Sequence, residues 1–354
     1  MGFLLTDEQR DFGRSLDAML TAADTPAAIR ARAGGDAGPA RALWARLAEA
    51  GVFALAVPEE YEGMGPLPVE TAVAFEELGR HAAPGPFAET VASAALLSAL
   101  AEAGTDAPAK RLLPALAAGE TVATLCAGPG PYAADADLAD VVLVVDGDRL
   151  LLAPGHGAVR ESADPARRLA RPEEGGELLA AGPAVVAAAE RARRWAALAT
   201  AAQCLGLGRA LLDRTVAYTK QRTQFGVPVG SFQAVRHRLA DVLIGLEFAR
   251  PLLHGAALTM TDADVAAAKV TAGEAAYAAA RAALQLHGAI GYTEELDLSL
   301  WLRKARPLRD TWGTPAECRA IVLAAAPLRR HDDPHDGPLP KGVWGVTVPA
   351  RSAP

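Results

Sequence analysis

The sequence holds little cysteine, no excess of positive charge and no long apolar run, and each shortage excludes a class of protein. Its 354 residues include 35 Lys and Arg against 42 Asp and Glu, a net charge of -7, which argues against a nucleic-acid-binding surface. No stretch approaches the ~18 uninterrupted apolar residues of a membrane span. Residues 1–10 lack the basic start and apolar core of a signal peptide. We therefore expect a cytoplasmic protein with no membrane span and no nucleic-acid partner.

The sequence also lacks the usual metal and nucleotide motifs. Three cysteines, Cys126, Cys204 and Cys318, are odd in number and widely spaced, so they predict buried thiols and not a disulfide frame or metal site. No GxGxxG, P-loop or zinc spacing occurs. His331 and His335 lie among aspartates in a proline-rich tail, where a solvated charge run is the more typical outcome. We expect no metal site.

The N-terminal third carries helix signals. Thr6-Asp7-Glu8-Gln9 has the form of a capping box, in which hydroxyl and amide groups satisfy the free N–H groups at a helix start. Gly51 is the kind of residue that ends a helix, here one over residues 41–50, and another helix is expected after Pro66. Residues 1–118 are therefore predicted to form a helical domain.

The residue pattern changes over residues 119–182. Short apolar runs are bounded there by Gly, Pro and Asp, and Asp146-Gly147-Asp148 is a hairpin signal. Residues 162–176 are charged and dotted with Pro and Gly, which predicts a loop. We expect a small β-domain in the middle of the chain.

Long helices are expected again over residues 183–327, because apolar residues recur there at steps of three and four. Four segments are predicted to form an antiparallel bundle: 184–221, 233–259, 262–287 and 314–326. A proline-rich tail follows over residues 328–354. The predicted fold class is mostly α with a small middle β-domain, between an N-terminal helical domain and a C-terminal four-helix bundle.

Local motifs in a fixed order give a sharper signal. Arg222-Thr223-Gln224-Phe225-Gly226 leads to Gly230-Ser231-Phe232-Gln233, and Gln285-Leu286-His287-Gly288-Ala289-Ile290-Gly291-Tyr292 follows. Leu302-Arg303-Lys304-Ala305 then precedes Gly313-Thr314, while Pro58-Glu59-Glu60-Tyr61-Glu62-Gly63-Met64-Gly65 stands upstream. In this order and spacing the chain resembles the acyl-CoA dehydrogenases over about residues 3–327.

The resemblance implies FAD as cofactor. A diphosphate needs a fixed cation, which the forked donors of an arginine supply, and a glycine allows the backbone to approach a ligand closely. The positions that match the family's FAD-binding residues, chiefly for the ADP half, are Arg222, Gln224, Phe225, Gln233, Gln285, Gly288, Ala289 and Thr314. In this family these C-terminal positions reach across to the flavin of a neighbouring subunit. The structural alternative is that Arg222 caps a helix, that the glycines only turn the chain and that His287 simply packs there.

The chain departs from the family where a subunit holds its own flavin. The family's Thr-Glu-Pro strand motif with its later Gly-Ser-Asp should fall near residues 126–131, which read Cys-Ala-Gly-Pro-Gly-Pro. A Trp followed by a small hydroxyl residue has no counterpart near residues 150–156. Ala316 stands where the family often has Gln. The resemblance thus implies a surface for a neighbour's FAD and little equipment for a flavin of its own.

The catalytic base shows a similar departure. The family removes a proton alpha to a thioester carbonyl while a hydride passes to the flavin, and a carboxylate must sit against the alpha carbon. The two positions that supply this carboxylate in the family are Trp312 and Ala196 here, with Ala197 following. Asp310 and Glu317 are nearby in sequence, and Asp310 is a weaker candidate for a substitute base. We expect no catalytic residue in this chain and expect Trp312 to fill the substrate cavity.

Three functions remain open at this point. The first is a non-catalytic subunit of an oxidoreductase, in which a homologous partner carries the Glu, binds most of the acyl-CoA and shares FAD in an α2β2 heterotetramer. The resemblance further implies an electron-transfer flavoprotein as acceptor and a role in lipid or steroid catabolism. The second is a self-sufficient homomeric flavoenzyme with a relocated base. The third is a cofactor-free scaffold or acyl-binding protein that keeps only the fold.

Overall fold

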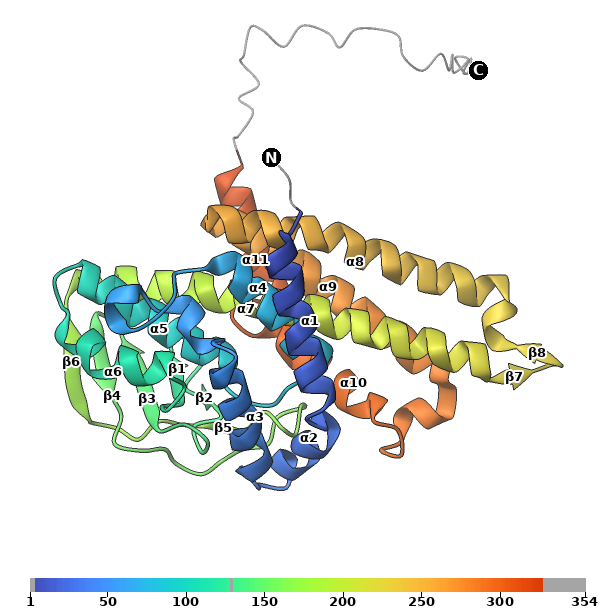
Figure 1. Ribbon diagram of the computed structural model, residues 1–354, viewed down its shortest axis with the longest axis horizontal. Coiled ribbons are helices and arrows are strands. Elements are labelled where there is room, and N and C mark those ends of the chain that lie inside the picture. Colours follow the sequence, from blue (N-terminus) through green and yellow to red (C-terminus); the bar gives the residue numbers. More distant parts are fainter. Residues whose placement is uncertain (1–3, 128–129, 327–354) are drawn as a thin grey trace, which may run out of the picture.

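The computed structural model describes residues 4–127 and 130–326, so the predicted tail with its His331 and His335, and Gly128 and Pro129, lie outside the described residues. Helices dominate, and a small sheet lies at one end of the long helix α7 (Figure 1). The N-terminal elements are α1 (Asp7–Thr21), α2 (Thr25–Ala33), α3 (Gly38–Glu49), η1 (Phe53–Ala56), η2 (Glu59–Tyr61), α4 (Pro68–Arg80), α5 (Phe87–Glu102) and α6 (Ala107–Ala117).

The sequence signals at the N-terminus act as expected. The capping box is confirmed, because Gln9 N donates to Thr6 Oγ1 at 3.2 Å and Thr6 N donates to Gln9 Oε1 at 2.9 Å. Helix α3 ends at Glu49, and Gly51 follows with φ +76°, the left-handed conformation that favours glycine. Helix α4 begins two residues after Pro66.

The small sheet has the strand order β1-β3-β4-β6, formed by β1 (Ala123–Cys126), β3 (Val141–Asp146), β4 (Arg149–Leu152) and β6 (Glu177–Ala181). β1 runs parallel to β3, and the other pairs are antiparallel. The predicted hairpin is confirmed: Asp146 pairs with Arg149 across a turn that contains Gly147 at φ +59°. Residues 162–176 are not entirely loop, because β5 (Leu169–Ala170) pairs there with β2 (Ala133–Ala134).

The C-terminal part contains one helix more than predicted. Its elements are α7 (Pro183–Gln221), β7 (Thr223–Gln224), β8 (Val227–Pro228), η3 (Val229–Ser231), α8 (Gln233–Thr259), α9 (Asp262–His287), η4 (Gly288–Tyr292), α10 (Leu298–Asp310) and α11 (Pro315–Ala325). Helix α10 packs on α7 and α9 and buries Trp301 and Ala305 completely. The sequence does carry a signal for α10, because its buried residues Leu298, Trp301, Ala305 and Leu308 recur at helical spacing, and the prediction missed it.

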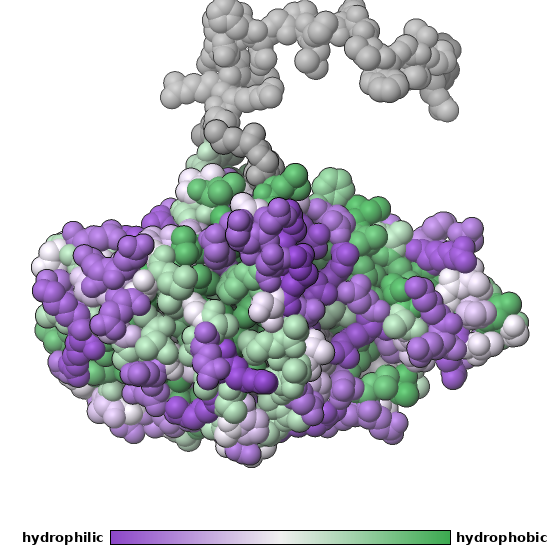
Figure 2. All heavy atoms as spheres, in the orientation of Figure 1, coloured by the Kyte–Doolittle hydropathy of each residue, from purple (hydrophilic) through white to green (hydrophobic). Residues whose placement is uncertain are grey.

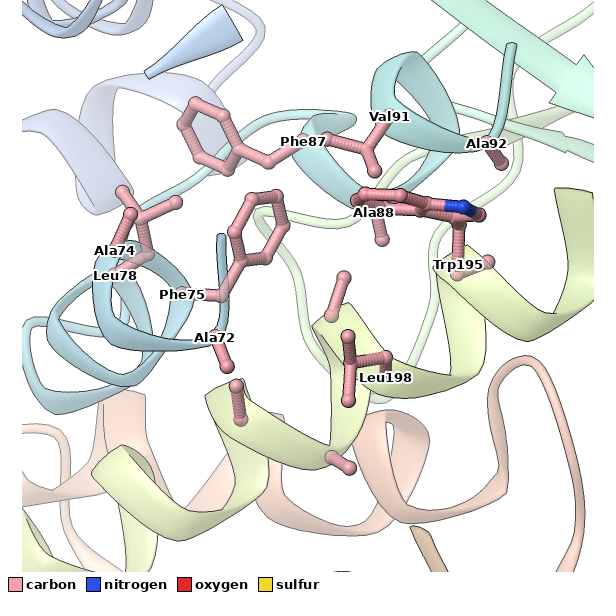
Figure 3. Close-up of a cluster of buried hydrophobic side chains, with 14 of the residues drawn as sticks. Ala72, Ala74, Phe75, Leu78, Phe87, Ala88, Val91, Ala92, Trp195 and Leu198 are labelled. Atoms are coloured by element: carbon pink, nitrogen blue, oxygen red, sulfur yellow. The ribbon is translucent and has the colours of Figure 1, made fainter. Parts of the chain in front are cut away.

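Helix α7 is the central element, with α4 and α5 of the N-terminal part on one side and α9 on another. Phe75, Phe87 and Val91 approach Trp195 and Leu198 of α7 in one apolar cluster (Figure 3). Dispersion and hydrophobic burial in such a cluster hold the N-terminal helices to the bundle.

Helices α4 and α7 touch backbone to backbone. A Cβ added at Gly206 of α7 would lie 1.8 Å from the carbonyl oxygen of Glu76 on α4. A Cβ at Gly79 of α4 would lie 2.1 Å from the carbonyl oxygen of Gln203 on α7. Each helix thus supplies the glycine that the other requires, and no rotamer change can relieve a clash with backbone.

Helices α7 and α8 are long and apolar enough, by length and composition alone, to cross a membrane. The apolar window of α7 is 94% buried inside the structure, as in the core helix of a globular protein. That of α8 is 39% buried, and α8 carries Glu247 and Arg250, which form an ion pair with each other at 3.6 Å. This finding is weak evidence for a span, and the absence of one stays a prediction.

Gly206→Ala is expected to lower the free energy of unfolding by about 1–3 kcal/mol or more, because the added methyl forces α4 and α7 apart. Gly245→Ala is the matched control. It is also a helical glycine, and its added Cβ would meet Ala275 at an ordinary 3.8 Å, so better helix propensity should leave it neutral or slightly stabilised. Denaturant unfolding of both variants checks this, and equal effects would contradict the close crossing.

Candidate functional site

The motif that begins at Arg222 forms a projecting hairpin. Strands β7 and β8 extend beyond the ends of α7 and α8, away from the sheet (Figure 1). Arg222 is the C-cap residue of α7, and its carbonyl accepts a hydrogen bond from Val229 N at 2.7 Å. Phe225 stands at the tip, 91% exposed and with φ +54°. Gln224 and Gln233 are exposed on either side of it. The ring of Phe225 meets that of Phe232, which is 39% exposed, at a centroid distance of 6.3 Å. An exposed apolar patch of this kind is typical of a surface that meets a ligand or another chain.

A groove of about 430 Å³ lies between the start of α8 and the end of α9. It is lined by Arg238, Arg281, Leu284, Gln285, Gly288, Ala289 and Tyr292. Gln285, Gly288 and Ala289, which the sequence singled out, therefore meet at one place. Gly288 ends α9 at φ +64°, and nothing within 4 Å would contact a Cβ there, so its backbone is open to a ligand.

Two lining arginines were not predicted. Arg238 Nη2 donates to Gln285 Oε1 at 2.9 Å, which fixes the amide of Gln285. Arg281 stands one turn before Gln285 on the same face of α9. The i, i+4 spacing of Arg281 and Gln285 is the sequence signal that could have found it.

Thr314 is not part of this groove in the single chain. It caps α11, where its hydroxyl accepts from Glu317 N at 3.3 Å and its backbone N–H donates to Glu317 Oε2 at 2.8 Å. A Cβ on the preceding Gly313 would lie 3.9 Å from Lys269. Lys269 and Gln285 are 16 residues apart on α9, which is roughly 24 Å at 1.5 Å per residue. Thr314 thus belongs to the opposite end of the bundle. Its neighbour Ala316 lies in the first turn of α11.

Trp312, at the expected base position, lies between α10 and α11 and meets a buried carboxylate. Its indole Nε1 donates to Glu89 Oε1 on α5 at 3.0 Å, and Glu89 is 6% exposed. Trp312 has φ +55°, which is uncommon for a bulky residue. The other expected base position, Ala196 on α7, is fully buried, and Ala197 follows it in the core. Sequence reasoning did not find Glu89, because nothing local connects it with a residue 223 positions away.

The two acids near Trp312 in sequence are engaged elsewhere. Asp310 ends α10 with a side chain 44% exposed, 3.7 Å from Arg309. Glu317 serves the capping box of α11, and the hydrogen bond from the backbone N–H of Thr314 lowers its pKa. Neither is placed against Trp312 by a contact of its own.

The interior beside Glu89 has little free space. The cavity there measures about 40 Å³, and its polar lining residues include Glu89, Thr200, Gln203 and Lys304. Such a volume holds a few water molecules, whereas a flavin ring or an acyl chain needs several hundred Å³.

Ion pairs tie the β-domain to its neighbours beside this cavity. Arg32 of α2, fully buried, contacts Asp135 at 2.9 Å and Asp137 at 2.5 Å. Arg168 also pairs with Asp137, at 2.7 Å. Burial raises the pKa of Asp135 to about 6 even though Arg32 is adjacent. Burial alone would raise the pKa of Asp137 too, but hydrogen bonds from Arg32 and Arg168 hold it at about 2.

A further ion pair joins the β-domain to the C-terminal bundle, because Lys304 of α10 lies 3.2 Å from the buried Asp164. Charged groups of this kind are stable in the interior only when paired. The β-domain is thereby closed onto α2 and α10.

One group outside these places has side chains of the metal-ligating kind. Ligand atoms of Asp17, Glu77 and His81 lie within 4.8 Å of one another. Arg80 Nε is 3.0 Å from Glu77, and His81 already pairs with Asp17 at 2.8 Å. Because the guanidinium of Arg80 already supplies a positive charge to these ligand atoms, we assign no metal ion to the cluster.

Comparison with known proteins places the chain in a family. Residues 6–120 match the acyl-CoA dehydrogenase N-terminal domain, and residues 186–326 match the C-terminal domain. Acyl-CoA dehydrogenase IpdE2 of Mycobacterium tuberculosis is 36% identical over 314 residues, which cover 88% of this chain and 95% of that protein. The chain therefore belongs to the acyl-CoA dehydrogenase family, as the motifs predicted. PigA, whose solved structure has a similar fold with 21% identity and a TM-score of 0.77, was solved as an FAD complex.

Two solved structures are similar along nearly the whole chain. The Tcur3481–Tcur3483 steroid ACAD matches with 26% identity and a TM-score of 0.75, over 90% of this chain and 97% of that one. The ChsE4–ChsE5 complex of Mycobacterium tuberculosis matches with 24% identity and a TM-score of 0.77, over 92% of this chain and 100% of that one. The predicted fold class is confirmed.

Asp135→Asn is expected to remove one component of the pH dependence of stability. The folded pKa of Asp135 is about 6, above its ordinary 3.8. The stability gained from its neutral form is therefore complete below pH ~4 and lost as the pH rises through about 6, by at most about 3 kcal/mol.

Denaturant unfolding from pH 4 to pH 7 should show this loss in the wild type and not in Asp135→Asn. Asp137→Asn is the control. The folded pKa of Asp137 is about 2, so its contribution is present above pH ~4 and lost only as the pH falls further. If the free energy of unfolding changes with pH identically in the wild type and in Asp135→Asn, the raised pKa of Asp135 is refuted.

Proposed function

We propose that the chain is a non-catalytic subunit of an FAD-dependent acyl-CoA dehydrogenase. It would lend an ADP-binding surface to a homologous partner that carries the catalytic Glu. The observation that carries the proposal is Trp312 at the base position, with its indole hydrogen-bonded to Glu89 beside a cavity of about 40 Å³. No carboxylate occupies either expected base position.

The chemistry explains why a partner is required. Bound FAD would supply an acceptor for the hydride of the β-carbon, and a carboxylate would have to take the proton from the α-carbon. Trp312 and Ala196 cannot take a proton. The residues of this chain would instead bind and orient the cofactor, through a guanidinium at Arg222 and amides at Gln224, Gln233 and Gln285. The exposed hairpin and the groove suit a cofactor that is housed mainly by another subunit.

An apolar stripe on α8 supports an association between subunits. Ile244, Phe248 and Leu252 recur every fourth residue and are 52%, 69% and 43% exposed. Hydrophobic spheres appear along the edge that α8 occupies (Figure 2). A row of large apolar side chains on one helix face is typical of a buried interface. The ChsE4–ChsE5 complex shows that two chains of this fold can assemble together.

The finer parts of the proposal rest on relatives. From the family resemblance we propose an α2β2 heterotetramer and an electron-transfer flavoprotein as acceptor, and cytoplasmic location stays a prediction. A bulky, steroid-like acyl-CoA as substrate is supported by the similarity to a steroid ACAD. In this arrangement the partner would bind most of the acyl-CoA.

A second candidate is a homomeric enzyme with a relocated base, and one observation favours it. Glu89 is a buried carboxylate that reaches the residue at the base position. For Glu89 to act, the ring of Trp312 would have to move away and open the cavity. A cofactor-free scaffold is the third candidate.

The purified chain alone is expected to be colourless and unable to oxidise acyl-CoA with an artificial electron acceptor, because loss of a positioned base costs a factor of about 10²–10⁴. With its partner it should hold one FAD per pair of chains. Flavin absorbance against protein concentration measures this ratio. A yellow, active single chain would establish the second candidate, and a complex without flavin would establish the third.

Phe248→Asp is expected to weaken the complex at least tenfold, because the interface would have to bury a charge without a partner. Val186→Asp is the control, since Val186 is 47% exposed and lies at the far end of α7. Analytical ultracentrifugation of both variants with the partner gives the dissociation constants. Equal dissociation constants for Phe248→Asp and Val186→Asp would show that α8 is not part of the interface.

A further inference from the structure

The groove at the end of α9 is a cationic site without an acid. Its described lining contains two guanidinium groups, from Arg238 and Arg281, and no carboxylate. Some arginines elsewhere on the bundle are neutralised by neighbours: Arg209 pairs with Glu247 at 2.6 Å, and Arg309 lies 3.4 Å from Glu274. What distinguishes Arg238 and Arg281 is that they line one groove together. Within residues 4–127 and 130–326, no ion pair involves Arg281 or Arg238. A pair of unneutralised arginines in a concave site favours an anionic ligand.

The orientation of Gln285 adds a directed donor. Arg238 Nη2 donates to Gln285 Oε1, so the acceptor of that amide is already engaged. The amide nitrogen is left as a donor for a ligand oxygen. Arg238 therefore acts on the ligand through Gln285.

The rest of the groove is not polar. Leu284 lines its wall, and the ring of Tyr292 is 77% exposed at its rim. Apolar and aromatic surface beside cations matches a molecule with a flat base at one end and phosphates at the other.

We propose that Arg281 is a direct contact to a phosphate of the ADP half of FAD, and that Arg238 is a positioning residue that fixes Gln285 for the same cofactor. The inference rests on the proposed function, because the flavin would be housed by the partner. Its chemistry is that of an adenosine diphosphate, which both FAD and CoA contain, and we assign it to FAD. Arg281 adds a second fixed cation to the one that Arg222 supplies, from a different helix.

The test uses the complex of this chain with its partner, stripped of flavin and titrated with FAD at low and at high salt. Arg281→Gln should raise the Kd for FAD by about 10- to 100-fold, as for loss of a hydrogen bond to a charged group. The variant's Kd for FAD should also depend less on salt concentration, because the site has one positive charge fewer for salt to screen. Arg281→Lys should keep the salt dependence and most of the affinity. Arg46→Gln, an exposed arginine on α3, is the control and should change nothing.

For Arg238, the test is a double-mutant cycle with Gln285→Ala. If Arg238 acts through Gln285, then Arg238→Met and Gln285→Ala together should weaken FAD binding no more than Gln285→Ala alone. Arg238→Lys, which keeps a donor for Gln285 Oε1, should bind FAD nearly as well as the wild type, in contrast to Arg238→Met. Full additivity of the two losses would overturn the positioning role.

The outcomes separate this inference from the proposed function. If the wild-type complex binds FAD and Arg281→Gln binds it equally well, the role of Arg281 is wrong while the proposed function stands. If Arg281→Gln leaves FAD binding intact but raises the KM for acyl-CoA, the phosphate belongs to CoA and the assignment to FAD is overturned. If the wild-type complex forms without binding FAD at all, the proposed function itself fails.

Discussion

The close crossing of α4 and α7 is the constraint on which the rest of the structure depends. Gly79 and Gly206 allow the two backbones to touch, and this contact sets the distance between the N-terminal helices and the bundle. Helix α5, which also packs on α7, is thereby held where Glu89 can reach Trp312. At a wider spacing the same side chains would leave room in the middle of the molecule. The small cavity beside Glu89 is thus a consequence of backbone packing as well as of side-chain size.

Charged groups at the centre of the molecule are paired, whereas at the end of α9 a charged and an apolar side chain are left uncovered. At the centre, Arg32 and Lys304 are matched by buried acids, so the domains are closed onto one another. At the end of α9, Arg281 is left without an acid, and Phe225 is left without cover. This distribution is the one that the proposed function requires, in which the chain helps to complete a site housed mainly by another subunit.

The sequence predicted most of the helices because their signals are local. The bounds of α8 and α9 were predicted from the spacing of their apolar residues. The structure adds a cap at Thr261, whose hydroxyl accepts from Asp264 N at 3.2 Å. The prediction missed helix α10, although its buried residues Leu298, Trp301, Ala305 and Leu308 recur at helical spacing. For the site, motifs predicted that Gln285 and Gly288 lie together, but Glu89 and Arg238 could not be found. Their roles depend on neighbours that only the folded chain brings close, and the assignments to cofactor binding stay predictions.

Two tryptophan indoles join the beginning of the chain to its end. Trp301 Nε1 donates to the carbonyl of Arg80 at 2.8 Å, and Trp312 Nε1 donates to Glu89, across separations of 221 and 223 residues. Contacts so distant in sequence form late, because a long loop must close first. During synthesis the N-terminal helices therefore emerge with the apolar surface for α7 and α10 still uncovered. The surface that Trp301 and Trp312 cover stays open until α10 and the residues after it have been made, and a truncation within α10 would leave part of it open permanently, with a greater risk of aggregation.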